Sequence, residues 1–398
     1  MTGVDWSRPA FPEIDFARDD VPDLPALMRD LRQRGRFVSI RFHEGVACLI
    51  THYDDVKAAF MDEETFPAAA AHREHTEPVL GRTMSTMMGR DHRTNRALVS
   101  HAFRPPVVRE AVEPLLEPLA EELVAQFSAR GSAELMDEFA RPMAFRVITR
   151  HMGIPVEDEP QIFDWGSRLL RFAWEPEAAL ESAARIREYL LGVVDERRRE
   201  VGRDLISELV QAEYETRRLD DQEIVTAILS LFAAGIDSPA NGIGNLIVNV
   251  LSRPELAVRA RTQPESLPSL AEESLRMTPS PALIPRKCPK ATSWRGTDLP
   301  ADSTVIFGIT SAHRDPDAFP DPDRFDAERK MDHSILSFGQ GVHLCVGAHL
   351  ARNEMQVALR TLLDRLPDIR LVQPDAIETV GGVLRGPRTL PVVFGSAS

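Results

Sequence analysis

The sequence predicts one domain built mainly from α-helices, with a smaller β portion. Residues 53–276 and 346–366 are rich in Ala, Leu, Glu and Arg and carry apolar residues three or four positions apart, a spacing typical of packed helices. Short strand-like runs are confined to residues 36–50, 283–307 and 369–395. Neither a repeat nor a linker-like segment divides the chain. We therefore expect a single folded unit over residues 1–398, large enough to enclose a sizeable ligand.

Composition and charge exclude several classes of protein. Hydrophobic residues make up 43% and charged residues 27% of the chain, an ordinary balance for a folded soluble protein. The net charge of −14 disfavours a nucleic-acid partner. No long uncharged apolar run predicts a membrane span, so we expect no membrane attachment. We also expect the protein to be cytoplasmic and monomeric. The three cysteines are far apart and form no CxxC pair, which excludes a disulfide framework and a four-cysteine zinc site: Cys48, Cys288 and Cys345.

The N-terminal third begins with strand signals and continues with helices. Residues 37–42 and 46–50 are short apolar runs separated by His43-Glu44-Gly45, which predicts a hairpin. Residues 66–90, rich in Ala, His, Gly and Met, interrupt the helical pattern. An interruption of this length predicts a functional loop.

A long apolar helix is predicted from Asp220 to Leu251. Asp220 is an N-cap and Glu223, three residues later, is its capping-box partner. A helix of about 30 residues spans roughly 45 Å, enough to cross a domain. Because it is apolar on most sides, we expect it to be buried at the centre of the molecule.

The middle of this helix contains an acid, an alcohol and a proline: Asp237, Ser238 and Pro239. Because Pro239 has no N–H for the carbonyl of Gly235, a local kink is expected there. An acid and an alcohol in a buried helix are suited to proton transfer. The alternative is a purely structural kink with Asp237 paired elsewhere.

The strongest local pattern is Phe338-Gly339-Gln340-Gly341-Val342-His343-Leu344-Cys345-Val346-Gly347. Its glycines allow a tight turn and a close approach to a flat ligand. Cys345 comes just before a helix predicted from about Gly347 to Leu366, where the helix dipole and free N–H groups stabilise a thiolate. A single anionic sulfur in this setting suits an axial ligand of haem iron. The alternative is a glycine-rich loop with an incidental cysteine.

This segment resembles the haem-binding signature of the cytochrome P450 superfamily, of the soluble bacterial type, and the order of the other motifs agrees over roughly residues 80–395. The resemblance implies the single-domain cytochrome P450 fold, with haem b (iron protoporphyrin IX) between the central long helix and the helix after the cysteine loop. It implies that Cys345 is the metal ligand, that Phe338 shields its sulfur, and that His343 reaches a haem propionate.

Three further basic residues resemble the family's propionate contacts. His92 and Arg96 are four apart and therefore share one face of a predicted helix, and Arg286 lies on a predicted strand. Arginine and histidine are natural partners for a carboxylate in a site with little water. The alternative for each is a solvated basic residue.

Glu273 and Arg276 are three apart on a predicted helix and resemble the family's Glu-x-x-Arg pair. The resemblance assigns the third member, an arginine in a later loop, to Arg324 of Pro322-Asp323-Arg324-Phe325. We expect a buried network with a structural role. The alternative is a surface ion pair of little energetic weight.

The resemblance implies a haem-thiolate monooxygenase that inserts one oxygen atom from O2 into a small or medium organic substrate. Asp237 and Ser238 are then the catalytic residues that manage protons. Family members usually carry Thr, followed by Thr or Ser, where this chain has Ser238 and Pro239. The alternatives are a peroxide-driven enzyme, a non-oxygenating coupling or rearrangement enzyme, a haem-based sensor, and a helical module without haem.

Partners and substrate walls follow from the same resemblance. Electrons are expected from a separate ferredoxin and ferredoxin reductase, or from a flavodoxin, docking near Arg104 and Arg352. The walls of the substrate pocket are expected at seven residues: Met84, Met87, Ala233, Ala234, Leu283, Ile284 and Leu384.

Overall fold

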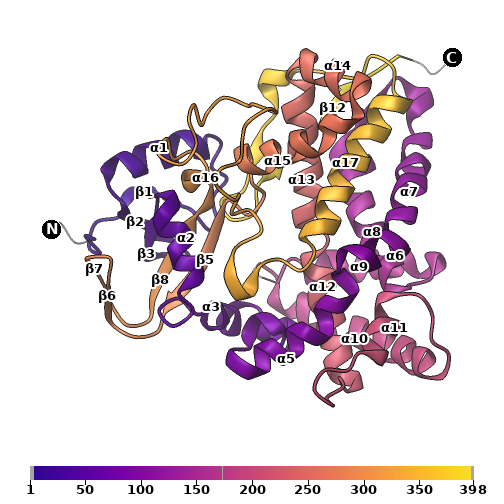
Figure 1. Cartoon of the computed structure of the whole chain (residues 1–398), viewed down its shortest axis with the longest axis horizontal. Coiled ribbons are helices and arrows are strands. Elements are labelled where there is room, and N and C mark those ends of the chain that lie inside the picture. Colours follow the sequence, from indigo (N-terminus) through magenta and orange to yellow (C-terminus); the bar gives the residue numbers. More distant parts are fainter. Residues whose placement is uncertain (1–3, 173, 396–398) are drawn as a thin grey trace.

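The computed structural model describes residues 4–172 and 174–395. Figure 1 shows a strand-rich part on the left and a helical part on the right. The α-helices are α1 Leu24–Arg34, α2 Tyr53–Met61, α3 Ala68–His75, α4 Glu77–Leu80, α5 Gly89–Ser100, α6 Pro105–Ala111, α7 Glu113–Ala125, α8 Arg141–Met152, α9 Glu159–Leu169, α10 Pro176–Arg199, α11 Leu205–Gln211, α12 Asp221–Ala234, α13 Asp237–Leu251, α14 Pro254–Thr262, α15 Leu267–Met277, α16 Ile309–Ala312 and α17 Ala348–Arg365.

The largest sheet has five strands in the order β1-β2-β3-β8-β5. The predicted hairpin is confirmed, since β2 and β3 are antiparallel and join at His43-Glu44. Strand β8 runs parallel to β3 and antiparallel to β5, which brings the C-terminal half of the chain onto the N-terminal hairpin. These strands are β1 Ala10–Asp15, β2 Phe37–Phe42, β3 Gly45–Ile50, β5 Leu283–Cys288 and β8 Ser303–Gly308.

The remaining strands form three small antiparallel sheets, β4-β12-β9, β10-β11 and β6-β7. Four of these short strands lie within residues 369–395, and the run expected at 388–394 pairs only over Pro391–Val393. Their bounds are β4 Ser132–Glu134, β6 Thr292–Trp294, β7 Thr297–Leu299, β9 Arg370–Leu371, β10 Thr379–Val380, β11 Gly386–Pro387 and β12 Pro391–Val393.

The predicted central helix begins as expected but is not continuous. Asp220 and Glu223 form a complete capping box at its start. The chain then leaves the helical path at Gly235-Ile236, so that α12 and α13 are separate helices. The break lies one turn before Pro239, where a proline cannot supply the N–H that a continuous helix needs. The expected kink is thus a full interruption.

The stretch Asp221–Leu251 is long and apolar enough to cross a membrane by length and composition alone. In this molecule it contributes most of its apolar side chains to the largest hydrophobic cluster, together with residues of α7, α8 and α17. Figure 1 shows α13 between α15 and α17 in the helical part. The interrupted helix pair is therefore a core element of a folded protein.

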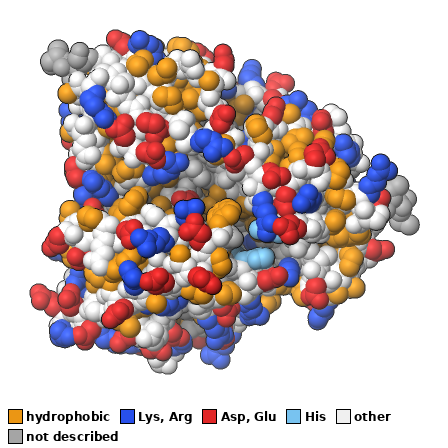
Figure 2. Space-filling model, turned by 180° about the vertical axis from the view of Figure 1, so that it is seen from behind, with side chains coloured by type: hydrophobic (Ala, Val, Ile, Leu, Met, Phe, Trp, Pro, Cys, Tyr) orange, Lys and Arg blue, Asp and Glu red, His pale blue; other side chains and the backbone are white. Residues whose placement is uncertain are grey.

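Residues 66–90, expected to be a loop, contain the short helices α3 and α4. Three alanines of α3 are buried, which explains the local helix: small residues let it pack closely beside β5. Acidic and basic side chains are interspersed over the surface seen from behind, and a hollow opens near the middle of that face (Figure 2).

Candidate active site

The cysteine loop is a tight turn that requires two of its glycines. Gly339 and Gly341 have φ of 70° and 74°, in the left-handed region that other residues rarely adopt. A Cβ at Gly341 would also lie 3.2 Å from the Phe60 carbonyl oxygen and from the Met61 sulfur. Within the loop, the Cys345 N–H donates to the Phe338 carbonyl at 2.9 Å. These constraints hold Cys345 at a defined position before α17.

Cys345 is accessible to solvent, although protein atoms surround its sulfur on most sides. Burial raises the pKa of the thiol, while the Gly347 N–H and the charges of Arg96 and Arg352 lower it. Gly347 is the N-cap of α17, so the helix begins close behind the cysteine as expected. A metal cation bonded to the sulfur favours the thiolate outright, and the surrounding donors support that charge.

Two histidines from distant parts of the chain meet in front of this loop. The rings of His92 on α5 and His343 are 4.2 Å apart. His92 is only 3% exposed and its Nε2 atom has no hydrogen-bond partner among the described residues. Burial, followed by the charges of His343 and Arg96, lowers the pKa of His92 to about 4.

Two arginines complete what we call the basic cluster: His92, Arg96, Arg286 and His343. Arg286 on β5 is buried, with its guanidinium over the rings of Phe60 and Phe307. Its hydrogen bond is to the neighbouring Pro285 carbonyl, and burial lowers its pKa to about 10. Arg96 donates to the Leu344 carbonyl. The cluster thus gathers donors from α5, β5 and the cysteine loop.

The basic cluster has fewer acceptors than donors. Within residues 4–172 and 174–395 its carboxylate contact is Glu63, 3.3 Å from the Nε2 atom of His343. An unpaired buried nitrogen on His92 and a buried guanidinium on Arg286 are costly unless an anion pairs with them. The two carboxylates of a haem have the charge and hydrogen-bonding capacity that these donors need, so the residues present fit the cofactor. Sequence reasoning missed Glu63, because no spacing links position 63 to position 343.

The break between α12 and α13 presents a small, partly polar surface. Ala234 is exposed in a helix that is otherwise largely buried, and Ala233 and Ser238 are partly exposed. A Cβ at Gly235 would lie 2.9 Å from Ile148, so close packing with α8 occupies the other side. Burial raises the pKa of Asp237, and Arg141 lowers it to a lesser extent. The break therefore combines open space with an acid that holds its proton more firmly than usual.

The expected Glu-x-x-Arg network exists, but its third member is Arg329. Arg276 and Glu273 form a buried two-point pair at 2.7 and 2.8 Å. The Nε atom of Arg329 donates to Glu273 at 3.2 Å, and this side chain is 7% exposed. The assignment of Arg324 was wrong: its side chain is 67% exposed and pairs with Asp326, and only its backbone carbonyl contacts Arg276.

His313, which sequence reasoning missed, joins this network to the cysteine loop. Its Nδ1–H donates to the Arg276 carbonyl at 3.0 Å, and its Nε2 accepts from the Leu336 N–H at 2.7 Å. Arg276 in turn donates to the His313 carbonyl at 2.8 Å. We call Glu273, Arg276, Arg329 and His313 the carboxylate network. It ties α15 to the segment that leads into Phe338.

The predicted pocket walls are only partly brought together. Leu283 is 0% exposed and packs in the apolar cluster beneath the large sheet, so it faces away from the site. Alternation along β5 explains this, since Ile284 and Arg286 share the opposite face. Leu384 is exposed beside Pro281. Met84 packs against the main core, and Met87 is buried and lines a different hollow, described below.

Comparison with known proteins identifies the family. The family model for cytochrome P450 matches residues 20–157 and 154–389. The chain is a cytochrome P450. It is 36% identical over 358 residues to the mycinamicin IV hydroxylase/epoxidase of Micromonospora griseorubida, covering 87% of this chain and 89% of the relative. It is 35% identical to the nocardicin C N-oxygenase of Nocardia uniformis subsp. tsuyamanensis, covering 92% and 94%.

The solved structure of the Bacillus subtilis bacillaene polyketide synthase P450 PksS superposes on this P450 with a TM-score of 0.87 at 29% identity, covering 93% of this chain and 96% of that one. The mainly helical P450 fold and the soluble bacterial type are therefore confirmed. The enzyme is a monooxygenase with haem b as its cofactor, and like other P450s it uses a small-molecule substrate, O2 and a redox partner. The hydroxylases, epoxidases and N-oxygenases among its relatives do not favour the peroxide-driven, non-oxygenating or sensor alternatives.

Proposed function

We propose that Cys345 would hold the haem iron through its sulfur, that the basic cluster would bind the propionates, and that Asp237 and Ser238 deliver protons during monooxygenation. The observation that carries this assignment is the juxtaposition of an accessible cysteine with a cluster of four basic side chains whose one carboxylate contact among the described residues is Glu63, and in which the buried Nε2 atom of His92 has no partner. The proposal extends to a cytoplasmic, single-domain monomer that receives electrons from a ferredoxin and its reductase, or from a flavodoxin.

When bound, haem supplies the activation of O2 and the transfer of one oxygen atom. The sulfur of Cys345 would bind the iron of the cofactor, and the basic cluster would bind its two carboxylates. The Gly347 N–H points at the sulfur and moderates its charge. Phe338, with the Arg352 guanidinium 4.4 Å from its ring centre, covers the approach to the loop.

Protons are supplied at the helix break. Asp237 lies at the first position of α13, and burial raises the pKa of its carboxyl, which suits it to accept and pass on a proton. Ser238 is the adjacent hydroxyl and is partly exposed beside Ala234. The break at Gly235-Ile236 interrupts the backbone hydrogen bonding of the helix, and water can bind the freed groups beside Asp237 and Ser238.

A redox partner docks outside the cysteine loop. Arg352 is held by two contacts to Glu272 at 2.8 and 3.0 Å, so its charge is already balanced. Arg104 is exposed, and no acidic side chain in the described part of the chain pairs with it. We therefore propose Arg104 as the member of the expected pair that attracts an acidic ferredoxin.

The test of the ligand assignment is the visible spectrum of the dithionite-reduced protein with carbon monoxide. A strongly red-shifted Soret band is expected for the parent protein and for the matched control Cys288→Ala, whose cysteine is buried in β5. Cys345→Ala should lose that band. A histidine-like band in the parent protein, or an unchanged band in Cys345→Ala, would refute the assignment.

The proton role is tested by Ser238→Ala with Ser238→Thr as the control. Loss of the hydroxyl should lower the yield of product per electron consumed, with the excess appearing as hydrogen peroxide, whereas threonine keeps the hydroxyl and the coupling. Unchanged coupling in Ser238→Ala during ferredoxin-driven turnover would show that this hydroxyl does not carry the proton.

A further inference from the structure

A polar pocket lies on the outer side of α5, apart from the basic cluster. Its volume is about 420 Å³, within the range of small-molecule sites. We call it the outer pocket. None of its lining residues belongs to the basic cluster, the cysteine loop or the helix break. They are Arg82, Met87, Arg90, Asp91, Thr94, Asn95, Tyr214, Glu215, Arg217 and Glu223.

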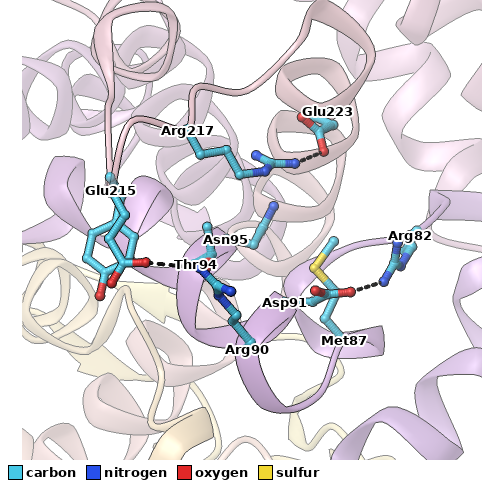
Figure 3. A pocket seen from close by; sticks show the side chains of 10 residues that line it. Arg82, Met87, Arg90, Asp91, Thr94, Asn95, Glu215, Arg217 and Glu223 are labelled. Carbon is cyan, nitrogen blue, oxygen red and sulfur yellow. Dashed lines mark hydrogen bonds and ion pairs between the residues drawn. The ribbon is translucent and has the colours of Figure 1, made fainter.

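The charged side chains of the outer pocket balance one another. Arg82 pairs with Asp91 at 2.5 Å, Arg90 with Glu215 at 3.5 Å, and Arg217 with Glu223. Figure 3 shows these pairs on different sides of the pocket. The three cations and three anions leave no net charge, so a charged ligand would have to break an existing pair. The pocket therefore favours an uncharged ligand that hydrogen-bonds to both signs of charge.

Asn95 points into this pocket without a partner. The residue as a whole is 7% exposed, and its side-chain amide makes no hydrogen bond within residues 4–172 and 174–395. Figure 3 shows the amide directed into the space between the ion pairs. The polar atoms of the amide remain open to solvent in the pocket, so a ligand can replace the water that they bind. Asn95 thus offers one acceptor and two donors to a ligand.

The far wall of the pocket is a preformed turn. Tyr214 and Arg217 exchange backbone hydrogen bonds at 3.0 and 2.9 Å. Glu215 and Thr216 between them have φ of 48° and 66°, and Thr is rarely found in this left-handed region. The ion pairs of Glu215 and Arg217 hold this turn against α5 and α12. A ligand then meets a wall that is already ordered, which lowers the entropy lost on binding.

We propose that the outer pocket binds an uncharged polyhydroxylated molecule, a pyranose sugar. The hydroxyls of a sugar donate and accept hydrogen bonds around the whole ring. They can therefore bond to the ion pairs on several walls of the pocket and to the free amide of Asn95. Tyr214 and Met87 add apolar surface for the C–H face of the ring. A nucleobase also has a neutral, stackable ring, but it presents its hydrogen-bonding groups along its edges in one plane and leaves the other walls unmatched.

The test uses the haem-loaded protein and three probes: the methyl α-pyranosides of D-glucose, D-galactose and L-rhamnose. Saturation-transfer NMR identifies binding, and calorimetry gives the Kd. We expect at least one glycoside to bind, Asn95→Leu to weaken it at least tenfold, and Gln211→Leu to leave it unchanged, because Gln211 lines a separate surface hollow. Binding should persist when imidazole occupies the haem iron, which separates this pocket from the substrate site.

Three results would overturn the proposal: no binding of any glycoside, equal binding by Asn95→Leu, or competition by imidazole. Stronger binding of adenosine than of the glycosides would identify a nucleobase site and also overturn it. Asn95 makes no side-chain hydrogen bond to the described residues, so Asn95→Leu should fold with a thermal midpoint close to that of the parent protein. A folded variant that fails to bind therefore supports the proposal.

Discussion

The carboxylate network and the basic cluster use the same kinds of side chain for opposite purposes. In the network, the Arg276 guanidinium is fully buried and donates to a carboxylate and to three backbone carbonyls. In the cluster, the buried Arg286 donates to one neighbouring carbonyl. Every N–H group of the Arg276 guanidinium has an acceptor, whereas several N–H groups of Arg286 have none among the described residues.

This difference separates scaffold from binding site. A buried charge with complete pairing contributes to one folded arrangement, and removing its partner is strongly destabilising. A buried charge with incomplete pairing weakens the fold of the protein alone and strengthens its hold on a ligand of opposite charge. Burial or residue type alone does not distinguish the two cases; the inventory of hydrogen bonds does.

The largest effect is expected at Glu273. Glu273→Gln removes the charge shared by Arg276 and Arg329, leaving two buried cations without an anion. We expect a loss of about 3–5 kcal/mol in the free energy of unfolding, measured by urea denaturation of the haem-loaded protein. A loss below about 1 kcal/mol would mean that the network is no more than a surface ion pair.

The comparison of Arg329 with Arg324 sharpens the assignment of the network. Arg329→Leu should cost about 2–3 kcal/mol, because Glu273 loses a buried charged hydrogen bond. Arg324→Leu should change stability by less than about 0.5 kcal/mol, because that side chain is exposed. Equal losses in the two variants would contradict the structure, and the reverse order would restore the assignment made from the sequence.

Arg286 should behave in the opposite way to Arg329. Arg286→Leu removes a buried cation that has few hydrogen-bond partners. The thermal midpoint of the haem-free protein should therefore stay the same or rise. Haem affinity should fall about tenfold to a hundredfold, because one charged hydrogen bond contributes about that factor. The rate at which haem transfers from the protein to apomyoglobin measures this loss. A destabilised haem-free protein with unchanged haem retention would place Arg286 in the scaffold.

The effect of His313 on stability is confined to acidic pH and is absent near neutrality. Burial, followed by the charge of Arg276, lowers its pKa from 6.5 to about 3. Below pH 6.5 the histidine binds a proton in the unfolded chain but not in the folded protein. The contribution of His313 to the free energy of unfolding is therefore fully present above pH 6.5 and is lost as the pH falls toward 3. The slope is about 1.4 kcal/mol per pH unit for one histidine. His313→Gln should remove this part of the slope, and an unchanged slope would show that His313 is protonated in the folded protein.

Local sequence determined much of the architecture and much of the candidate site. The apolar spacing of α12 and α13, the capping box at Asp220 and the hairpin of β2 and β3 are short-range features, since each depends on residues a few positions apart. The cysteine loop is equally local, because Gly339 and Gly341 specify its turns. For the same reason the sequence pointed to Cys345, His92, Arg96 and His343 by motif alone.

Only the tertiary structure decided which distant residues meet. Arg324 and Arg329 are five positions apart and chemically identical, and the path of the chain after α15 buries one and exposes the other. Leu283 and Ile284 are both apolar, and the pleat of β5 turns one toward the core and the other toward the site. Glu63, His313 and the free amide of Asn95 gain their significance from neighbours far away in the chain. Such pairings depend on which donors and acceptors the fold satisfies, a property of the packed molecule and not of any local pattern.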